Sequence, residues 1–88
     1  MTIFDNINLL KYNMNAIVKY LVIFEKTEKG YSAYVPDLSG CIATGKTKSI
    51  IEKHIIEAIQ FHLEGLKEEN IKIPLSKTQA DTFVFALK

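Results

Sequence analysis

Three short segments in the first half of the chain carry the apolar patterning of β-strands. They cover residues 18–26, 31–35 and 41–44. In the first of them, residues 20–24 are apolar without a break, so both faces of the strand are apolar. Such a strand is typical of a central position with cover on both sides.

Turn-forming residues separate these segments. Residues 27–30 predict a hairpin turn in which Gly30 is free to take a positive φ. After the second strand, Pro36 ends the ladder because it has no N–H. Asp37 can bond the backbone two residues on, and Gly40 permits a sharp turn. A compact loop is therefore expected between the second and third strands.

A long amphipathic helix is predicted next. Thr47 is a good N-cap residue, and the helix is expected to run to about Glu69 and to stop near Asn70, with Pro74 shortly beyond. At 100° per residue, one wide apolar stripe is formed by Ile51, Ile55, Ala58, Ile59, His62, Leu63 and Leu66. This stripe is expected to face the sheet.

A second apolar strip lies on one flank of the same helix. Ile50 and Phe61 fall outside the main stripe, with His54 beside them. One interpretation is a second contact surface, for example with another subunit. The other, weighted equally, is that both apolar residues lie at the margin of the core.

The end of the chain alternates again. Phe83, Phe85 and Leu87 alternate with Val84 and Ala86, which predicts a last strand over residues 82–87. The fold is therefore expected to be α+β, with the order β-β-β-α-β and one long helix packed on one face of a mixed sheet. A helix crossover places the last strand parallel to the first.

The first 15 residues differ in character. They carry several asparagines, which are poor helix formers, and Met14 directly precedes the first convincing strand. We expect an N-terminal extension over residues 1–15, flexible or a short helix, and one domain over residues 16–88.

Composition and charge narrow the class of protein. The chain has 11 basic and 10 acidic side chains and a net charge of +1, whereas nucleic-acid binders usually concentrate positive charge. Its one cysteine, Cys41, cannot form an internal disulfide, and no apolar run is long enough to span a membrane. The cytoplasm is the expected compartment.

Candidate metal and nucleophile sites are weak. His54 and His62 lie about 80° and roughly 12 Å apart on a helix, too far to share one ion. Cys41 has no evident base beside it and is better interpreted as a packed thiol. The acidic residues do not converge on one place, as metal-assisted nuclease chemistry requires. We therefore expect no metal, no cofactor and no catalytic residue.

One phosphate-binding pattern matches literally. Gly40, four residues, Gly45, Lys46 and Thr47 follow the spacing of a P-loop. A P-loop needs the four intervening residues to be loop, but here they are predicted to be strand. The match is interpreted as accidental.

The central block carries a more specific pattern. The run Val35-Pro36-Asp37-Leu38-x-Gly40-Cys41, with Gly45 and Thr47 after it, resembles the HicB-like antitoxin family. The resemblance covers residues 18–88 and implies a partial ribonuclease H-like fold without the nuclease centre. It also implies neutralisation of a HicA-like messenger-RNA-cleaving toxin by protein contact, and self-association into dimers or tetramers.

The chain departs from the family pattern at several points. Ser39 stands where proline is frequent, and Ile50, Ile51 and His54 replace acidic, small or asparagine residues in the helix. Many members also carry a C-terminal DNA-binding domain, and because this sequence ends after its last predicted strand we expect no direct DNA binding.

A contact surface is expected on the hairpin, the loop and the helix flank. The candidate partner-binding residues are Tyr31, Tyr34, Pro36, Asp37, Leu38, Ile50, His54 and Phe61. Two alternatives to toxin neutralisation remain open: a stand-alone oligomeric domain with a regulatory ligand, and a residual nuclease or nucleotide-binding enzyme that uses residues 40–47.

Overall fold

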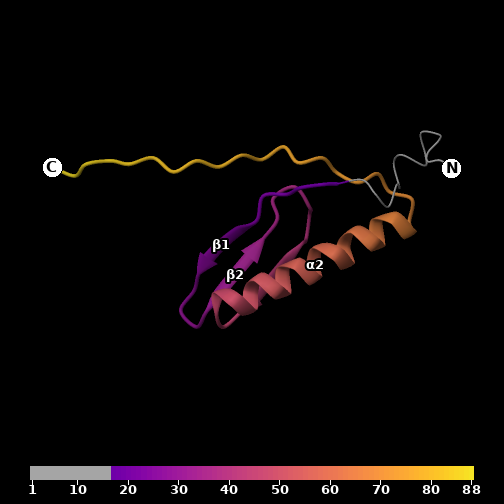
Figure 1. The fold of residues 1–88 in the computed structure, drawn as a ribbon, viewed down its shortest axis with the longest axis horizontal. Coiled ribbons are helices and arrows are strands. Elements are labelled where there is room, and N and C mark those ends of the chain that lie inside the picture. Colours follow the sequence, from indigo (N-terminus) through magenta and orange to yellow (C-terminus); the bar gives the residue numbers. More distant parts are fainter. Residues whose placement is uncertain (1–16) are drawn as a thin grey trace.

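The computed structural model describes residues 17–88, so the predicted N-terminal extension lies outside the described residues. Within them the elements are β1 (Ile23–Lys26), β2 (Tyr31–Tyr34), β3 (Ile42–Gly45) and α2 (Lys48–Glu68). The strands form an antiparallel sheet in the order β1-β2-β3. The helix packs along β3 and β2 on one face of this sheet (Figure 1). The α+β class and the three-strands-then-helix order are as predicted.

The hairpin between β1 and β2 is closed by a tight turn. Lys26 pairs with Tyr31, and the amide of Thr27 donates to the carbonyl of Gly30 at 2.8 Å. Gly30 is not among the described residues with positive φ, so the expected reason for this glycine is wrong. A Cβ atom there would collide with the carbonyl oxygen of Gly45 and lie 2.9 Å from the Cα of Lys46. Gly30 is required because two backbone segments approach each other closely.

The loop between β2 and β3 is compact, as predicted. The amide of Val35 donates to the carbonyl of Cys41 at 3.1 Å. The amide of Cys41 donates to the carbonyl of Leu38 at 3.0 Å. Gly40 has a φ of 79°, the left-handed conformation that favours glycine. These bonds satisfy the backbone of a loop whose ends are buried.

The core lies between the loop, the sheet and the first half of α2. Its buried apolar residues are Ala33, Val35, Leu38, Cys41, Ile51 and Ile55. Cys41 is 5% exposed, and burial raises the pKa of its thiol. Cys41 is therefore a packed residue of the core, as expected, and holds little of the thiolate form that nucleophilic chemistry needs.

Local signals place both ends of α2. The Thr47 hydroxyl accepts from the amide of Ile50 at 3.1 Å, which is the predicted N-cap. At the other end, Asn70 has a φ of 59°, and the amide of Ile71 donates to the carbonyl of Leu66 at 2.8 Å. This is the hydrogen-bond pattern of a Schellman C-cap.

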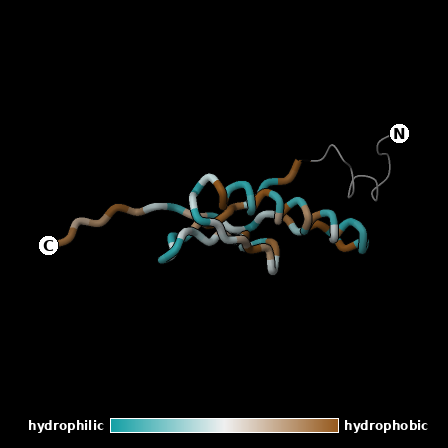
Figure 2. Tube along the Cα trace, turned by 90° about the horizontal axis from the view of Figure 1, so that it is seen from below, coloured by the Kyte–Doolittle hydropathy of each residue, from teal (hydrophilic) through white to brown (hydrophobic). Residues whose placement is uncertain are grey.

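The predicted last strand is wrong for the single chain. Residues 71–88 contain no strand, and the sheet of the described residues is antiparallel rather than mixed. β1 is consequently an edge strand, not the predicted central one. The physical reason is that a strand exists only when its N–H and C=O groups meet a neighbour. Residues 81–88 run past the sheet as an exposed, extended segment (Figures 1 and 2).

The first part of this C-terminal segment is nevertheless fixed to the domain. The Tyr20 hydroxyl donates to the carbonyl of Pro74 at 2.6 Å. Asp37 accepts from the amides of Lys77 and Thr78, at 2.9 and 3.0 Å, and from the Thr78 hydroxyl at 2.9 Å. Residues 74–78 are therefore held against the domain, and the chain leaves it only after Thr78.

Candidate functional site

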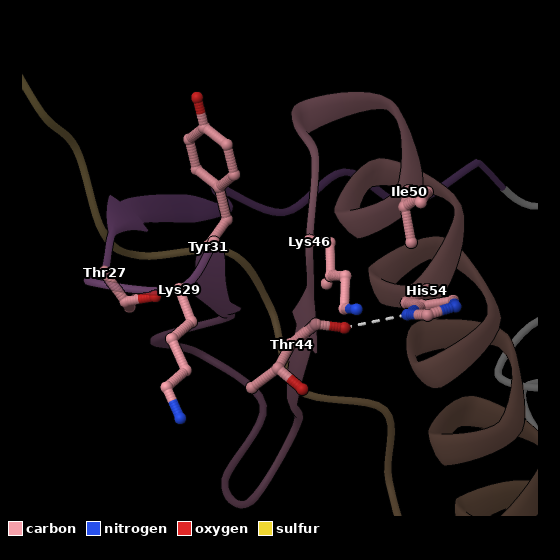
Figure 3. Close-up of a pocket in the computed structure, with 9 residues that line it drawn as sticks. Thr27, Lys29, Tyr31, Thr44, Lys46, Ile50 and His54 are labelled. Atoms are coloured by element: carbon pink, nitrogen blue, oxygen red, sulfur yellow. Dashed lines mark hydrogen bonds between the residues drawn. The ribbon is translucent and has the colours of Figure 1, made fainter.

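Three of the predicted contact residues line one hollow, between the hairpin and the start of α2. Tyr31, Ile50 and His54 line it together with residues of the hairpin turn and of the connection between β3 and α2 (Figure 3). Its volume is about 420 Å³. We call it the hairpin hollow. The Nδ1–H of His54 donates to the carbonyl of Thr44 at 2.8 Å, which ties the helix to β3. This bond fixes the ring at the wall of the hollow.

The surroundings of the hairpin hollow are basic. Lys29 and Lys46 line it, whereas no acidic residue does. Two further ammonium groups lie nearby over aromatic rings, Lys26 at 4.9 Å from the centre of Tyr31 and Lys48 at 4.4 Å from that of Phe24. Sequence reasoning missed this cluster because its lysines come from the hairpin turn, the turn before α2 and the adjoining ends of β1 and α2, which only the fold brings together.

A second hollow lies at the opposite end of β2, beside the compact loop. It has a volume of about 380 Å³ and is lined by residues 34–36 and 38–42, none of them charged. Tyr34 and Pro36 belong to it. We call it the loop hollow.

An apolar row leads from the loop hollow across the face of the sheet that α2 does not cover. The strand register places Ile23 opposite Tyr34 and Tyr34 opposite Ile42. Side chains alternate along strands, so these three point away from the face of the buried Ala33. Tyr34 is 37% exposed and Ile42 63%. Ile42 was not among the predicted contact residues, although its alternation with the buried Cys41 could have indicated it.

Two predicted contact residues have internal roles in the structure. Leu38 is 1% exposed and belongs to the core. The carboxylate of Asp37 is occupied by the C-terminal segment, and the backbone N–H groups of Thr78 and Lys77 lower its pKa. An approach to either side chain from outside would compete with these contacts.

Phe61 lies apart from both hollows. It is 79% exposed on α2, so the core-margin interpretation does not hold for it, whereas Ile50 is 41% exposed beside the hairpin hollow. A contact role for this flank remains a prediction.

The observed secondary structure does not fit a P-loop between Gly40 and Thr47. The residues between Gly40 and Gly45 include most of β3, and the Thr47 hydroxyl caps the helix. Within residues 17–88, no three His, Cys, Asp or Glu side chains lie close enough to hold a metal ion. Nor is any helix in this part of the chain long and apolar enough to cross a membrane.

Comparison with known proteins settles the family. The family model described as HicB_like antitoxin of bacterial toxin-antitoxin system matches residues 20–85. The chain belongs to the HicB-like antitoxin family.

Relatives of this HicB-like chain occur in Thermoplasma acidophilum and in a Haemophilus phage. The chain is 44% identical over 66 residues to a UPF0150 protein of Thermoplasma acidophilum, which covers 74% of the chain and 96% of that protein. It is 40% identical over 57 residues to an uncharacterized 14.9 kDa protein of Haemophilus phage HP1, covering 65% of the chain but only 43% of the phage protein.

A solved structure shares the fold of this HicB-like chain. It is a chain of the HicA3 and HicB3 toxin-antitoxin complex, with 36% sequence identity and a TM-score of 0.56. The match covers 62% of the present chain and 64% of that chain, so more than a third of each lies outside it.

Proposed function

We propose that this chain is an antitoxin that acts in the cytoplasm by covering a HicA-like toxin through direct protein contact, without catalysis of its own. The observation that carries the proposal is the apolar row of Ile23, Tyr34 and Ile42, which continues into the uncharged loop hollow. Exposed apolar surface of this kind marks protein contact sites. The match to a chain of a toxin–antitoxin complex supports the same partner class.

Electrostatics favours the loop hollow over the hairpin hollow as the toxin site. A toxin that cleaves messenger RNA needs basic surface to hold phosphates. Lys29 and Lys46 would repel such a surface, whereas the loop hollow and the apolar row carry no charge. Tyr34 offers an aromatic anchor with a hydroxyl, which is typical of residues that dominate binding energy.

Affinity measurements on surface variants test this proposal. Tyr34→Ala and Ile42→Asp are each expected to weaken binding to the proposed HicA-like toxin by roughly 30-fold, as for an interface hot spot. Ile56→Asp is the matched control, because Ile56 is a similarly exposed isoleucine, at 54%, that lies on the helix. Circular dichroism checks that all three variants fold.

Two results would contradict the proposal. One is equal loss of affinity for Ile42→Asp and Ile56→Asp, which would remove the apolar row from the interface. The other is a neighbouring basic protein that never co-elutes with the wild-type chain. That second result would favour a stand-alone oligomeric domain with another ligand.

A further inference from the structure

The C-terminal segment has the alternating pattern of a strand, but it pairs with no strand of residues 17–88. Its apolar side chains are almost fully in water, with Phe83 73%, Val84 94%, Phe85 82% and Leu87 98% exposed. Figure 2 shows this apolar stretch running clear of the body of the molecule. Alternation of large apolar residues suits a pleated, half-buried surface, and its exposure to water is unfavourable.

The origin of this segment is fixed while its end is free. Tyr20 holds the carbonyl of Pro74, and Asp37 holds the amides of Lys77 and Thr78. Residues 79–88 therefore begin at the loop end of the sheet and extend beyond it (Figure 1). This segment therefore projects from the molecule, and we call residues 79–88 the arm.

β1 provides a matching acceptor edge. It pairs with β2 on one side, and no strand of the described residues pairs with its other side. The backbone of the helix lies over β2 and β3 and not close to that of β1, which the helix reaches through the Lys48 side chain over the Phe24 ring. The opposite edge of the sheet is better covered, since His54 on α2 already donates to the Thr44 carbonyl of β3. Residues 20–24 also have the two apolar faces of a central strand, although β1 lies at an edge.

We propose that residues 82–87 of one chain pair with β1 of a second copy, and that the two copies exchange these arms reciprocally. Addition of a strand to an open edge satisfies the backbone of both partners, and its side chains find apolar neighbours on both faces. This inference is independent of toxin binding, because it concerns only copies of this chain. It assigns the fourth strand of the sheet to the neighbouring molecule.

A second copy fits the arm better than a toxin does. The unpaired apolar strand and the unpaired apolar edge belong to the same chain, so two copies satisfy both needs at once by a closed, symmetric contact. Each buried phenylalanine covers about 150–250 Å². Two exchanged arms, with four phenylalanines and their apolar neighbours, approach the area of about 1,200–2,000 Å² that a stable interface buries.

The solution mass of the full chain, without any toxin, tests the exchange. Light scattering after size exclusion is expected to give at least twice the 10.0 kDa of one chain. Phe83→Asp with Phe85→Asp is expected to give a monomer, because two charges enter the exchanged strand. Gln79→Asp with Ala80→Asp is the matched control, in the same exposed segment but outside residues 82–87, and is expected to keep the wild-type mass.

Isotope-filtered NMR on a mixture of two differently labelled samples distinguishes exchange from folding back. Contacts between residues 82–87 and residues 23–26 are expected across the two labels. If residues 82–87 contact residues 23–26 only within one chain, so that no contact joins the two labels, the proposal is overturned. A monomeric wild-type chain would overturn it too. So would an unchanged mass for the Phe83 and Phe85 double variant. A monomeric chain whose double variant no longer binds the proposed HicA-like toxin would show that the arm holds the toxin instead.

Discussion

Two glycines have opposite roles in this small domain. Gly30 lies against the backbone of Gly45 and Lys46, whereas a Cβ at Gly65 on α2 would have nothing within 4 Å. The first glycine is required by packing between two backbone segments. The second contributes no packing, and it gives the unfolded chain more conformational freedom to lose on folding than alanine would.

Alanine substitutions at these positions are expected to change stability in opposite directions. Gly30→Ala should lower the free energy of unfolding by about 1–3 kcal/mol. The new methyl group would meet the backbone of Gly45 and Lys46, which can move away only if the hairpin is distorted. Gly65→Ala should raise it by about 0.5–1 kcal/mol. Urea denaturation measures both. Equal midpoints for the two variants would contradict the close approach at Gly30.

A single carboxylate, that of Asp37, anchors the C-terminal segment at Lys77 and Thr78. The amides of Thr78 and Lys77 hold the pKa of Asp37 below its ordinary value of 3.8. A lowered folded pKa means that the ionised anchor stabilises the folded arrangement fully above the unfolded value. This contribution declines as the pH falls below 3.8 and through the lower folded pKa.

An acid titration of the Thr78 amide by NMR should therefore show a midpoint below 3.8. Asp37→Ala is expected to remove this titration and to speed hydrogen exchange at Lys77 and Thr78. Asp81→Ala is the control, since Asp81 is an exposed aspartate of the same segment. A midpoint at or above 3.8, or an unchanged Thr78 amide in Asp37→Ala, would contradict the anchor.

Elements defined by local signals were predictable from the sequence, and those that depend on distant partners were less so. The helix was predicted within one residue at each end, because Thr47 and Asn70 act on the turns beside them. The strand at 82–87 was predicted from the same kind of pattern, yet its existence depends on a neighbour elsewhere. Alternation indicates a strand but does not say which edge receives it.

The candidate site was predictable to a similar extent. Tyr31 was selected on the hairpin, and Ile50 and His54 on the helix flank. The three meet in the hairpin hollow, because the hairpin and the helix start share one end of the sheet. Ile42 was missed because its place beside Tyr34 follows from the register of a four-residue strand. The role of Asp37 could not be foreseen, since its partners lie 40 and 41 residues away.

The whole molecule presents two distinct surfaces to its surroundings. One is the uncharged loop hollow with the apolar row, which we assign to the toxin. The other is the exposed arm with the open edge of β1, which we assign to a second copy. The two surfaces meet at Ile23, which lies in β1 and in the apolar row, so changes away from it, at Phe83 and Phe85 or at Ile42, are the ones that weaken self-association and toxin binding one at a time.

Neutralisation by contact requires that the chain act as a stoichiometric cover and not as an enzyme. The most direct test is RNA cleavage by the proposed HicA-like toxin, titrated with this chain. We predict that cleavage falls in proportion to added chain and stops at a fixed molar ratio, and that the chain alone leaves RNA intact. Cleavage that persists with excess chain bound, or RNA cleaved by the chain alone, would contradict the account.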